Sequence, residues 1–559
     1  MEALVVASGQ EHLLSQVPDF ESSNVHAQLL KFNIAQSVQR FHRAVAADTA
    51  LTAAMAPTTE ASIDPLSSAV IWSGLAAQRQ QELCDIGLQA VADGHVAAVI
   101  MSGGQGTRLG FSGPKGMYDM SLPSGKTIFQ LHVDKVSKVR QLAHAYARLH
   151  AGPSAPTPSV PLYIMTSDLN DTTIRAFFTA HKFFGYPPQD VFFFEQGLEP
   201  CFTLDGKVIL DSKDSLSMAP DGNGGIYSAL ESSGALGDMQ RRGVQHLHIY
   251  GIDNVLTRAL DPGFLGAAIE AGAQCANKVV PRAHAGEKVG VTALRGGRMC
   301  VVEYCELPSH LAGSSDAATG RLVFGAANIC NHYFSLAFLR DQVLPFIQGG
   351  GGNACLASTP YHVARKKIPY YDAASDSVVT PAAANGIKLE LFIFDVFPLA
   401  ERWLVLEVDR RDEFAPVKNE PGNVSDSPDT ARALIHDQAV RWLEAVGCSV
   451  WEPPSAGHGG GMHGDPAACD ELRGLVGGLG LDSEGLGRIQ GTGLPTPPVP
   501  KRHRSITQTM DLPLLAEGYN KEAVAAAAPM VEISPLLSYA GEGLEAFRGA
   551  VVRPPCYLE

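Results

Sequence analysis

A glycine-rich segment at residues 101–116, MSGGQGTRLGFSGPKG, has the residue types that phosphate binding needs. It follows a short apolar run, and its four glycines between 103 and 110 remove side chains where a ligand must approach the backbone. Backbone N–H groups in such a loop can converge on phosphate oxygens. Arg108 adds a bidentate fork and Lys115 a point charge. The segment therefore predicts a site for a phosphorylated ligand.

Two better-known phosphate loops do not fit the spacing of this segment. The dinucleotide fingerprint G-x-G-x-x-G would need a glycine where the chain has Leu109. The Walker A pattern, aligned on Gly-Lys-Thr at 125–127, would need a glycine where the chain has Met120. A plain structural turn is the remaining alternative, but a turn needs fewer glycines and neither of the two cations.

Polar residues that follow other short apolar runs could read a ligand bound at the same place. Gln196 closes a predicted strand in FFFEQG, and an amide offers both a donor and an acceptor, although an ordinary loop glutamine would look the same. Gly222 and Asn223 lie in SMAPDGNGGIY, which also fits a turn. Asp253 follows HLHIYGI and Asp395 ends LFIFD, where a carboxylate can hold Mg²⁺ or cap a helix.

These polar residues are expected at one edge of a mainly parallel sheet. Short apolar runs predict strands at 96–101, 161–167, 190–197, 246–254, 277–281, 300–307, 387–397 and 402–410. Helical spacing at 127–149 and 172–185 separates some of them, which is typical of βαβ units. Because ligands bind outside the carboxyl ends of strands in such sheets, residues that end strands are candidates for the site.

The overall composition excludes several classes of protein. The 559 residues include 43 Lys and Arg against 58 Asp and Glu, a net charge of −15. So acidic a chain has no general attraction for nucleic acid or an anionic membrane. The ten cysteines form no C-x-x-C pair, and no apolar run reaches the length of about 18 residues that marks a membrane span. We expect a cytoplasmic protein that binds neither nucleic acid nor membrane.

The segment GGQGTRLGFSGPKGMYD resembles the signature of the eukaryotic UDP-N-acetylhexosamine pyrophosphorylases, within the UDP-sugar pyrophosphorylase family. The resemblance continues in family order through SMAPDGNGGIY, DNVL, KVGV, VVEYCE, GAANICNHYF, NGIKLELFIFD and DEFAPVKN, over most of residues 96–420. It implies an α/β fold, a Rossmann-like nucleotidyltransferase of the glycosyltransferase-A-like kind with a mixed, mainly parallel sheet.

Three regions are predicted along the chain. Residues 1–92 have helical spacing and form a helical N-terminal region. Residues 93–420 carry the family motifs and form the catalytic domain. Residues 421–559 form a small C-terminal α+β domain with a Gly/Pro-rich insertion at about 453–500.

The resemblance implies that UTP and N-acetylglucosamine 1-phosphate react to give UDP-N-acetylglucosamine and pyrophosphate. The sugar phosphate attacks the α-phosphate directly, so positioning and charge stabilisation dominate catalysis. The implied catalytic cations are Arg108, Lys115, Lys388 and Lys418. The implied UTP-binding residues are Met101, Ser102, Gly103, Gly104, Lys115, Gln196, Gly222, Asp253 and Lys388. The implied sugar-phosphate-binding residues are Asn223, Gly290, Glu303, Tyr304, Asn328 and Lys418.

Mg²⁺ is the expected cofactor, with Asp253 at the end of a strand as its ligand, and we expect a monomer or a weak homodimer. Whether N-acetylgalactosamine 1-phosphate also serves as a substrate stays open at this point. A UDP-glucose or broad-specificity UDP-sugar pyrophosphorylase is one alternative, and a non-catalytic nucleotide-sugar sensor is another. The sensor is disfavoured because sensing alone would not require the full set of cations.

Overall fold

The computed structural model describes residues 1–17, 19–54, 63–66, 68–348, 361–450, 530–552, 554 and 556–559. The glycine tract at 349–352 and the Gly/Pro-rich segment at 453–500 lie outside the described residues. No helix in the described ranges is long and apolar enough to cross a membrane.

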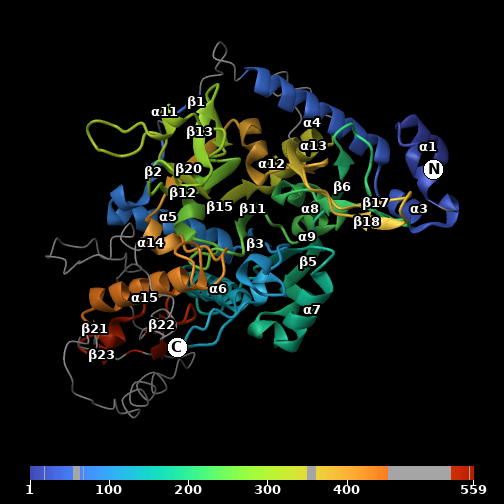
Figure 1. Cartoon of the computed structure of the whole chain (residues 1–559). Coiled ribbons are helices and arrows are strands. Elements are labelled where there is room, and N and C mark those ends of the chain that lie inside the picture. The colour runs from blue at the N-terminus through green and yellow to red at the C-terminus, as the bar shows by residue number, and fades with distance from the viewer. Residues whose placement is uncertain are drawn as a thin grey trace, which may run out of the picture.

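A large mixed sheet lies at the centre of the molecule (Figure 1). Its main path runs β2 (Val70–Ile71), β20 (Trp403–Glu407), β12 (Cys275–Pro281), β15 (Ala326–Ser335), β11 (His246–Gly251), β3 (Val96–Met101), β4 (Leu162–Thr166) and β5 (Val191–Glu195). Strands β11, β3, β4 and β5 are parallel, as are β2, β20 and β12. Only β15 on this path runs antiparallel to its neighbours. The predicted mixed, mainly parallel sheet is confirmed.

Strand β3 shows why the strands of this sheet appear in the sequence as unbroken apolar runs. All of its residues are buried, and they alternate between two hydrophobic cores: Val96, Ala98 and Ile100 in one, Ala97, Val99 and Met101 in the other. The first core also takes residues from α5 (Ala77–Ala92), α6 (Ile128–Ala151), α7 (Asp171–Ala180) and α10 (Pro262–Glu270). The second takes residues from α8 (Ile226–Ser232) and α9 (Ala235–Arg241). Because both faces of a parallel sheet are covered, its strands have apolar residues on both sides.

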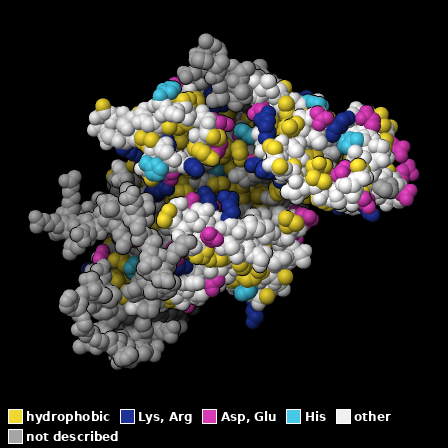
Figure 2. Space-filling model, viewed as in Figure 1, with side chains coloured by type: hydrophobic (Ala, Val, Ile, Leu, Met, Phe, Trp, Pro, Cys, Tyr) yellow, Lys and Arg dark blue, Asp and Glu magenta, His cyan; other side chains and the backbone are white. Residues whose placement is uncertain are grey.

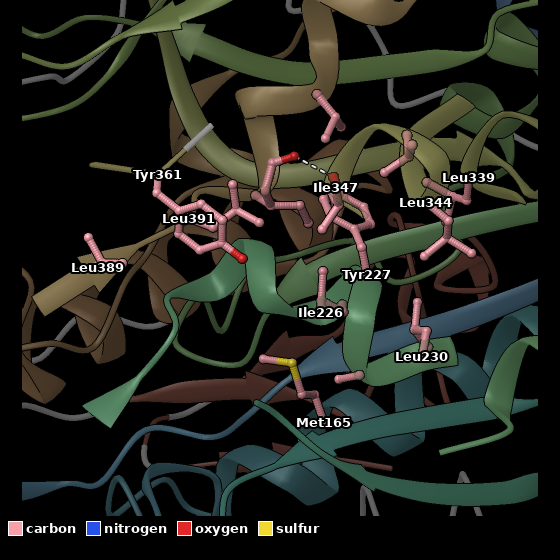
Figure 3. Close-up of a cluster of buried hydrophobic side chains, with 14 of the residues drawn as sticks. Met165, Ile226, Tyr227, Leu230, Leu339, Leu344, Ile347, Tyr361, Leu389 and Leu391 are labelled. Atoms are coloured by element: carbon pink, nitrogen blue, oxygen red, sulfur yellow. Dashed lines mark hydrogen bonds between the residues drawn. The ribbon is translucent and has the colours of Figure 1, made fainter. Parts of the chain in front are cut away.

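The start of α8 is anchored in the second core, below the loop that carries Asn223. Figure 3 shows Ile226, Tyr227 and Leu230 among buried side chains that come from distant segments, including Leu389 and Leu391. The hydroxyl of Tyr227 donates a hydrogen bond to the carbonyl oxygen of Ile393. The core therefore fixes the 221–225 loop against the chain that follows β19 (Gly386–Glu390).

The strand predicted at 387–397 is shorter than expected. After β19 the chain turns into a 3₁₀-helix at Ile393–Leu399. The backbone N–H of Phe392 donates to Oδ2 of Asp395 at 2.7 Å, which caps the helix, and Pro398 lacks the N–H that a ladder would use. The run is largely apolar, but the cap at Asp395 favours a 3₁₀-helix over a strand in its second half.

Several short elements surround the central sheet. The arm beside β15 comprises β1 (Ile63–Asp64), β13 (Val291–Arg295) and β14 (Arg298–Val302). The smaller sheets comprise β6 (Leu198–Pro200), β7 (Phe202–Thr203), β8 (Leu210–Ser212), β9 (Ser215–Leu216), β10 (Met218–Pro220), β16 (His362–Lys366), β17 (Tyr370–Asp372) and β18 (Ser377–Val379). The remaining short helices are α11 (Ser309–Ala312), α12 (Leu336–Phe338), α13 (Leu344–Ile347) and α14 (Arg410–Glu413).

The two ends of the chain pack on opposite sides of the sheet (Figure 1). The first helices are α1 (Glu2–Ala7), α2 (His12–Gln16), α3 (Asn24–Leu29) and α4 (Ile34–Ala54). The last elements are α15 (Pro428–Ala445), β21 (Ser449–Val450), β22 (Val531–Ile533), β23 (Val551–Val552) and β24 (Cys556–Leu558). The last elements dock on the segment before α6, where Nζ of Lys126 donates to the hydroxyl of Ser534 at 3.4 Å and the hydroxyl of Ser124 donates to Glu532 at 2.7 Å.

Candidate active site

The glycine loop begins where β3 ends and turns back on itself. The N–H of Gly106 donates to the carbonyl of Gly113 at 2.9 Å, and the N–H of Lys115 donates to the carbonyl of Gly104 at 3.3 Å. Among the described residues, no acceptor pairs with the backbone N–H groups of Gly103 and Gly104. Free N–H groups at a strand end suit an anionic ligand. Within the described residues, the loop therefore presents two backbone donors at the end of β3.

Gln196 lies directly against this loop. A side chain at position 103 would overlap Oε1 of Gln196, so only glycine allows the two segments to come this close. Asn170 supports the same loop, because its amide donates to the carbonyl of Gly103 at 3.0 Å and its oxygen accepts from the N–H of Ser167 at 2.7 Å. Sequence reasoning missed Asn170, since nothing nearby in the chain links it to residues 102–103.

A cavity of about 280 Å³ opens at the carboxyl ends of β3 and β11. Residues predicted for the site that line this cavity are Met101, Gly104, Lys115, Asn223, Asp253, Asn328 and Lys418. Figure 2 shows Lys and Arg side chains gathered along a hollow across the middle of this face. Seven positions chosen from scattered motifs thus meet at one place in the fold.

Lys115, Asp253 and Lys418 set the charge of the cavity. The Nζ of Lys115 lies 4.0 Å from Oδ2 of Asp253. Burial lowers the pKa of Lys115 below its usual range; Asp253 raises it, while the nearby Arg108 and Lys418 lower it. The pKa of a buried lysine falls further when other cations are close, so these three cations form one electrostatic group that favours a polyanion.

The segments that carry Asp253 and Lys418 are joined by hydrogen bonds. The N–H of Val417 donates to the carbonyl of Asp253 at 2.9 Å. The amide of Asn254 donates to the carbonyl of Glu413 at 2.7 Å and accepts from the N–H of Ala415 at 2.8 Å. Asn254 also lines the cavity, and sequence reasoning missed it because its partners lie far along the chain.

Asn223 is oriented by the chain after β19. Its Oδ1 accepts from the N–H of Ile393 at 3.0 Å, which leaves its amide NH₂ to donate elsewhere. The carbonyl of Leu391 accepts from the N–H of Gly224 at 2.7 Å. A side chain at Gly222, where φ is +87°, would overlap the backbone of Leu391. The motifs around 222 and 391 therefore form one unit.

Gly290, Glu303 and Tyr304, which are also predicted near the sugar, are not among the residues that line the cavity, whereas Asn328 is. The N–H of Asn328 donates to the carbonyl of Gly290 at 2.8 Å, and a side chain at 290 would lie 3.0 Å from Oε1 of Glu303. Burial raises the pKa of Glu303, and the neighbouring Glu306 raises it further. Tyr304 is exposed. Glu303 and Tyr304 do not line the cavity itself.

Some predicted residues take other positions. Arg108 and Lys388 are not among the residues that line the cavity, although Arg108 is close enough to influence Lys115. The hydroxyl and the backbone N–H of Ser102 both donate to the carbonyl of Met165, at 2.7 and 2.9 Å, so this residue holds the loop to β4. Asp395 accepts from Nε2 of His362 at 3.0 Å and from the N–H of Phe392, which leaves it unsuited as a second metal ligand.

The cavity suits a metal that is held mainly by the substrate. Among the residues that the structure describes, no three His, Cys, Asp or Glu side chains gather as a metal site. Asp253 is the one carboxylate in the described lining. Mg²⁺ is commonly held by one or two carboxylates together with substrate phosphates, so Asp253 beside a phosphate loop fits this ion.

An α/β sheet that brings a glycine-rich loop and two lysines to the carboxyl ends of its strands has the arrangement that a nucleotidyltransferase needs. The chain belongs to the UTP–glucose-1-phosphate uridylyltransferase family, whose sequence profile matches residues 47–424. This membership agrees with the resemblance found in the motifs.

Curated relatives and solved structures show which members of this family the chain is similar to. The chain is 40% identical to UDP-N-acetylglucosamine diphosphorylase 2 of Arabidopsis thaliana over 85% of this chain and 77% of the relative. It is 37% identical to the UDP-N-acetylglucosamine pyrophosphorylase of Saccharomyces cerevisiae over 79% of this chain and 87% of the relative. The crystal structure of the uridine diphosphate N-acetylglucosamine pyrophosphorylase from Trypanosoma brucei, in complex with an inhibitor, matches with a TM-score of 0.71 and 27% identity over 99% and 97% of the two chains.

Proposed function

We propose that this chain is a uridylyltransferase that forms UDP-N-acetylglucosamine and pyrophosphate from UTP and N-acetylglucosamine 1-phosphate. The observation that carries this function is the cavity at the strand ends, where the glycine loop, Lys115, Asp253 and Lys418 meet Asn223 and Asn328. Relatives that share 37% and 40% identity over most of this chain are named for the same product.

The reaction needs charge control and no protein nucleophile. An oxygen of the sugar phosphate forms a bond to the α-phosphorus of UTP, while the bond from that phosphorus to the bridging oxygen breaks and pyrophosphate leaves. Lys115 and the N–H groups of Gly103 and Gly104 stabilise the triphosphate as charge moves onto the leaving group. Lys418 holds the sugar phosphate for attack in line. Gln196 reads the uracil edge through its amide.

Members of this class generally use a divalent metal, and we propose Mg²⁺ with Asp253 as its protein ligand. Bound there, Mg²⁺ would neutralise phosphate charge. Arg108 and Lys388 complete the proposed set of catalytic cations, and Gly290, Glu303, Tyr304 and Asn328 the sugar side. The proposed partners are UTP, the N-acetylhexosamine 1-phosphates, the UDP-sugar and pyrophosphate.

A pyrophosphate-release assay with UTP, Mg²⁺ and a panel of sugar 1-phosphates tests the function. We expect release with N-acetylglucosamine 1-phosphate and little with glucose 1-phosphate; the N-acetylgalactosamine arm decides whether both hexosamines are substrates. Equal release with glucose 1-phosphate would favour a broad-specificity enzyme. No release with any sugar, despite tight binding of UDP-sugar, would favour a sensor.

A further inference from the structure

Asp221 is a buried carboxyl group that the proposed reaction does not use. It immediately precedes Gly222 and Asn223, and only 7% of its surface is exposed. Its Oδ1 has no hydrogen-bond partner among the described residues. An unpaired buried polar atom costs free energy, so a protein that keeps one at the edge of a ligand site calls for an explanation.

The carboxyl group fills space that two glycines leave open. A side chain on Gly197 would lie 2.5 Å from Oδ2 of Asp221, and a side chain on Gly225 would overlap Oδ1. Gly197 directly follows Gln196, and Gly225 closes the loop that carries Asn223. The Asp221 side chain therefore lies between the two loops that we assign to the base and the sugar phosphate.

The backbone of Asp221 joins the same segments. Its N–H donates to the carbonyl of Gly197 at 3.3 Å, and its carbonyl accepts from the N–H of Leu391 at 2.8 Å. The first bond continues the pairing of β10 with β6, which ends where these two loops begin. A shift of Asp221 would therefore change the spacing between the loop of Gln196 and the loop of Asn223.

Helix α4 supports this arrangement from the N-terminal region. The hydroxyl of Ser37 donates to Oε2 of Glu199 at 2.8 Å, and the guanidinium of Arg40 pairs with Oε1 of the same carboxylate. Burial and the nearby Glu199 together raise the pKa of Asp221 to about 7, although Arg40 acts against this shift. The side chains of α4 thus fix the strand that leads away from Gly197.

We propose that Asp221 is a positioning residue for uridine recognition, because it sets the distance between the Gln196 loop and the 222–225 loop. This inference rests on the proposed function, which assigns Gln196 to the base and Asn223 to the sugar phosphate. With Asp221 in place, its carboxyl group keeps Gly197 of the first loop and Gly225 of the second at a fixed spacing. Without this carboxyl group, the Gln196 loop can move into the space that the group filled. The site then discriminates less between uracil and other bases.

Kinetics with UTP and CTP test this role, because the two bases differ at the edge that an amide reads. In Asp221→Ala, we expect KM for UTP to rise about tenfold and the preference for UTP over CTP to fall about tenfold. The kcat at saturating UTP changes by less than about threefold, because the catalytic cations are intact. Asp221→Asn keeps the volume and retains most of the preference. Asp211→Ala, at an exposed carboxylate on β8, is the matched control and changes nothing.

Asp221→Ser provides a second variant that leaves the space open if the alanine variant does not fold. An unchanged KM for UTP and an unchanged UTP preference in the Ala or Ser variant would overturn the proposal. An equal loss of kcat with both nucleotides, together with a lower melting temperature, would also overturn it, because that marks a purely structural residue. If the wild-type chain releases no pyrophosphate, the proposed function fails instead, and calorimetric Kd values for UTP and CTP still test Asp221.

Discussion

At the scale of single residues, two lysines carry the chemistry that we propose. Lys115 comes from the glycine loop and Lys418 from a segment about 300 residues later, and both line the cavity with Asp253. Their neighbours differ, since the Nζ of Lys115 lies 4.0 Å from Asp253, whereas Lys418 is held through its backbone N–H, which donates to the carbonyl of Asp426 at 2.7 Å.

Removing each lysine should affect the binding of a different substrate. Lys115→Met and Lys418→Met should each lower kcat by roughly 10²–10³-fold, the usual cost of losing one group that stabilises transition-state charge. We expect KM for UTP to rise in the first variant and KM for the sugar phosphate in the second, measured by pyrophosphate release. Lys213→Met, on an exposed turn between β8 and β9, is the control. Near-normal kcat in both variants would remove these lysines from the reaction.

At the scale of elements, a buried ion cluster holds three segments beneath the cavity. Lys278 of β12 is fully buried, and its Nζ lies 2.5 Å from Asp261 at the start of α10 and 2.6 Å from Glu413 of α14. The carbonyl of Glu413 also accepts the hydrogen bond from Asn254. The cluster therefore ties the sheet to the turn that leads to Lys418.

Breaking this cluster should cost far more stability than breaking a surface pair. In Lys278→Met, Asp261 and Glu413 stay buried without their nearest cation, although Arg258 remains 3.8 Å from Glu413. Removing one partner of a buried ion pair typically costs about 3–5 kcal/mol. In Arg79→Gln, the lost partner is the exposed Glu270, and the expected cost is about 1 kcal/mol or less. Urea unfolding midpoints measure both. Equal losses in the two variants would show that the cluster does not lock these elements.

Strands could be predicted from the sequence, but the residues that support the site through contacts with distant segments could not. The unbroken run at 96–101 and the run ending before Asp253 became β3 and β11, because a strand buried on both faces leaves a clear apolar signature. Asn170, Asn254 and Asp221 were missed because each acts through a segment that is distant in sequence or through the space left by a glycine. The division into regions 1–92, 93–420 and 421–559 stays a prediction.

At the scale of the whole molecule, buried histidines should contribute to the loss of stability in acid. Burial lowers the pKa of His132 and His332 to about 3 and that of His246 and His248 to about 4. The unfolded chain therefore binds more protons below about pH 6.5, and stability falls as the pH drops through this window. Asp221, whose pKa is raised to about 7, acts in the opposite sense, as do Glu303 and Glu532, whose pKa values are raised by burial.

A histidine variant checks this sign. His332→Leu removes one buried titrating ring, so between pH 7 and pH 5 the variant should lose about 2 kcal/mol less unfolding free energy than the wild type. Chemical unfolding at the two pH values gives the difference. His310→Gln, at an exposed position, should keep the wild-type dependence. Equal pH dependence in all three proteins would contradict the buried-histidine account.

A chain with a net charge of −15 thus concentrates a few cations around one cavity that we assign to two phosphorylated substrates. The most direct test is a crystal structure of the chain with UTP and Mg²⁺. The account predicts the triphosphate along residues 101–116, with a phosphate oxygen within hydrogen-bond reach of Lys115 and the uracil against Gln196. A triphosphate bound away from this loop would contradict it.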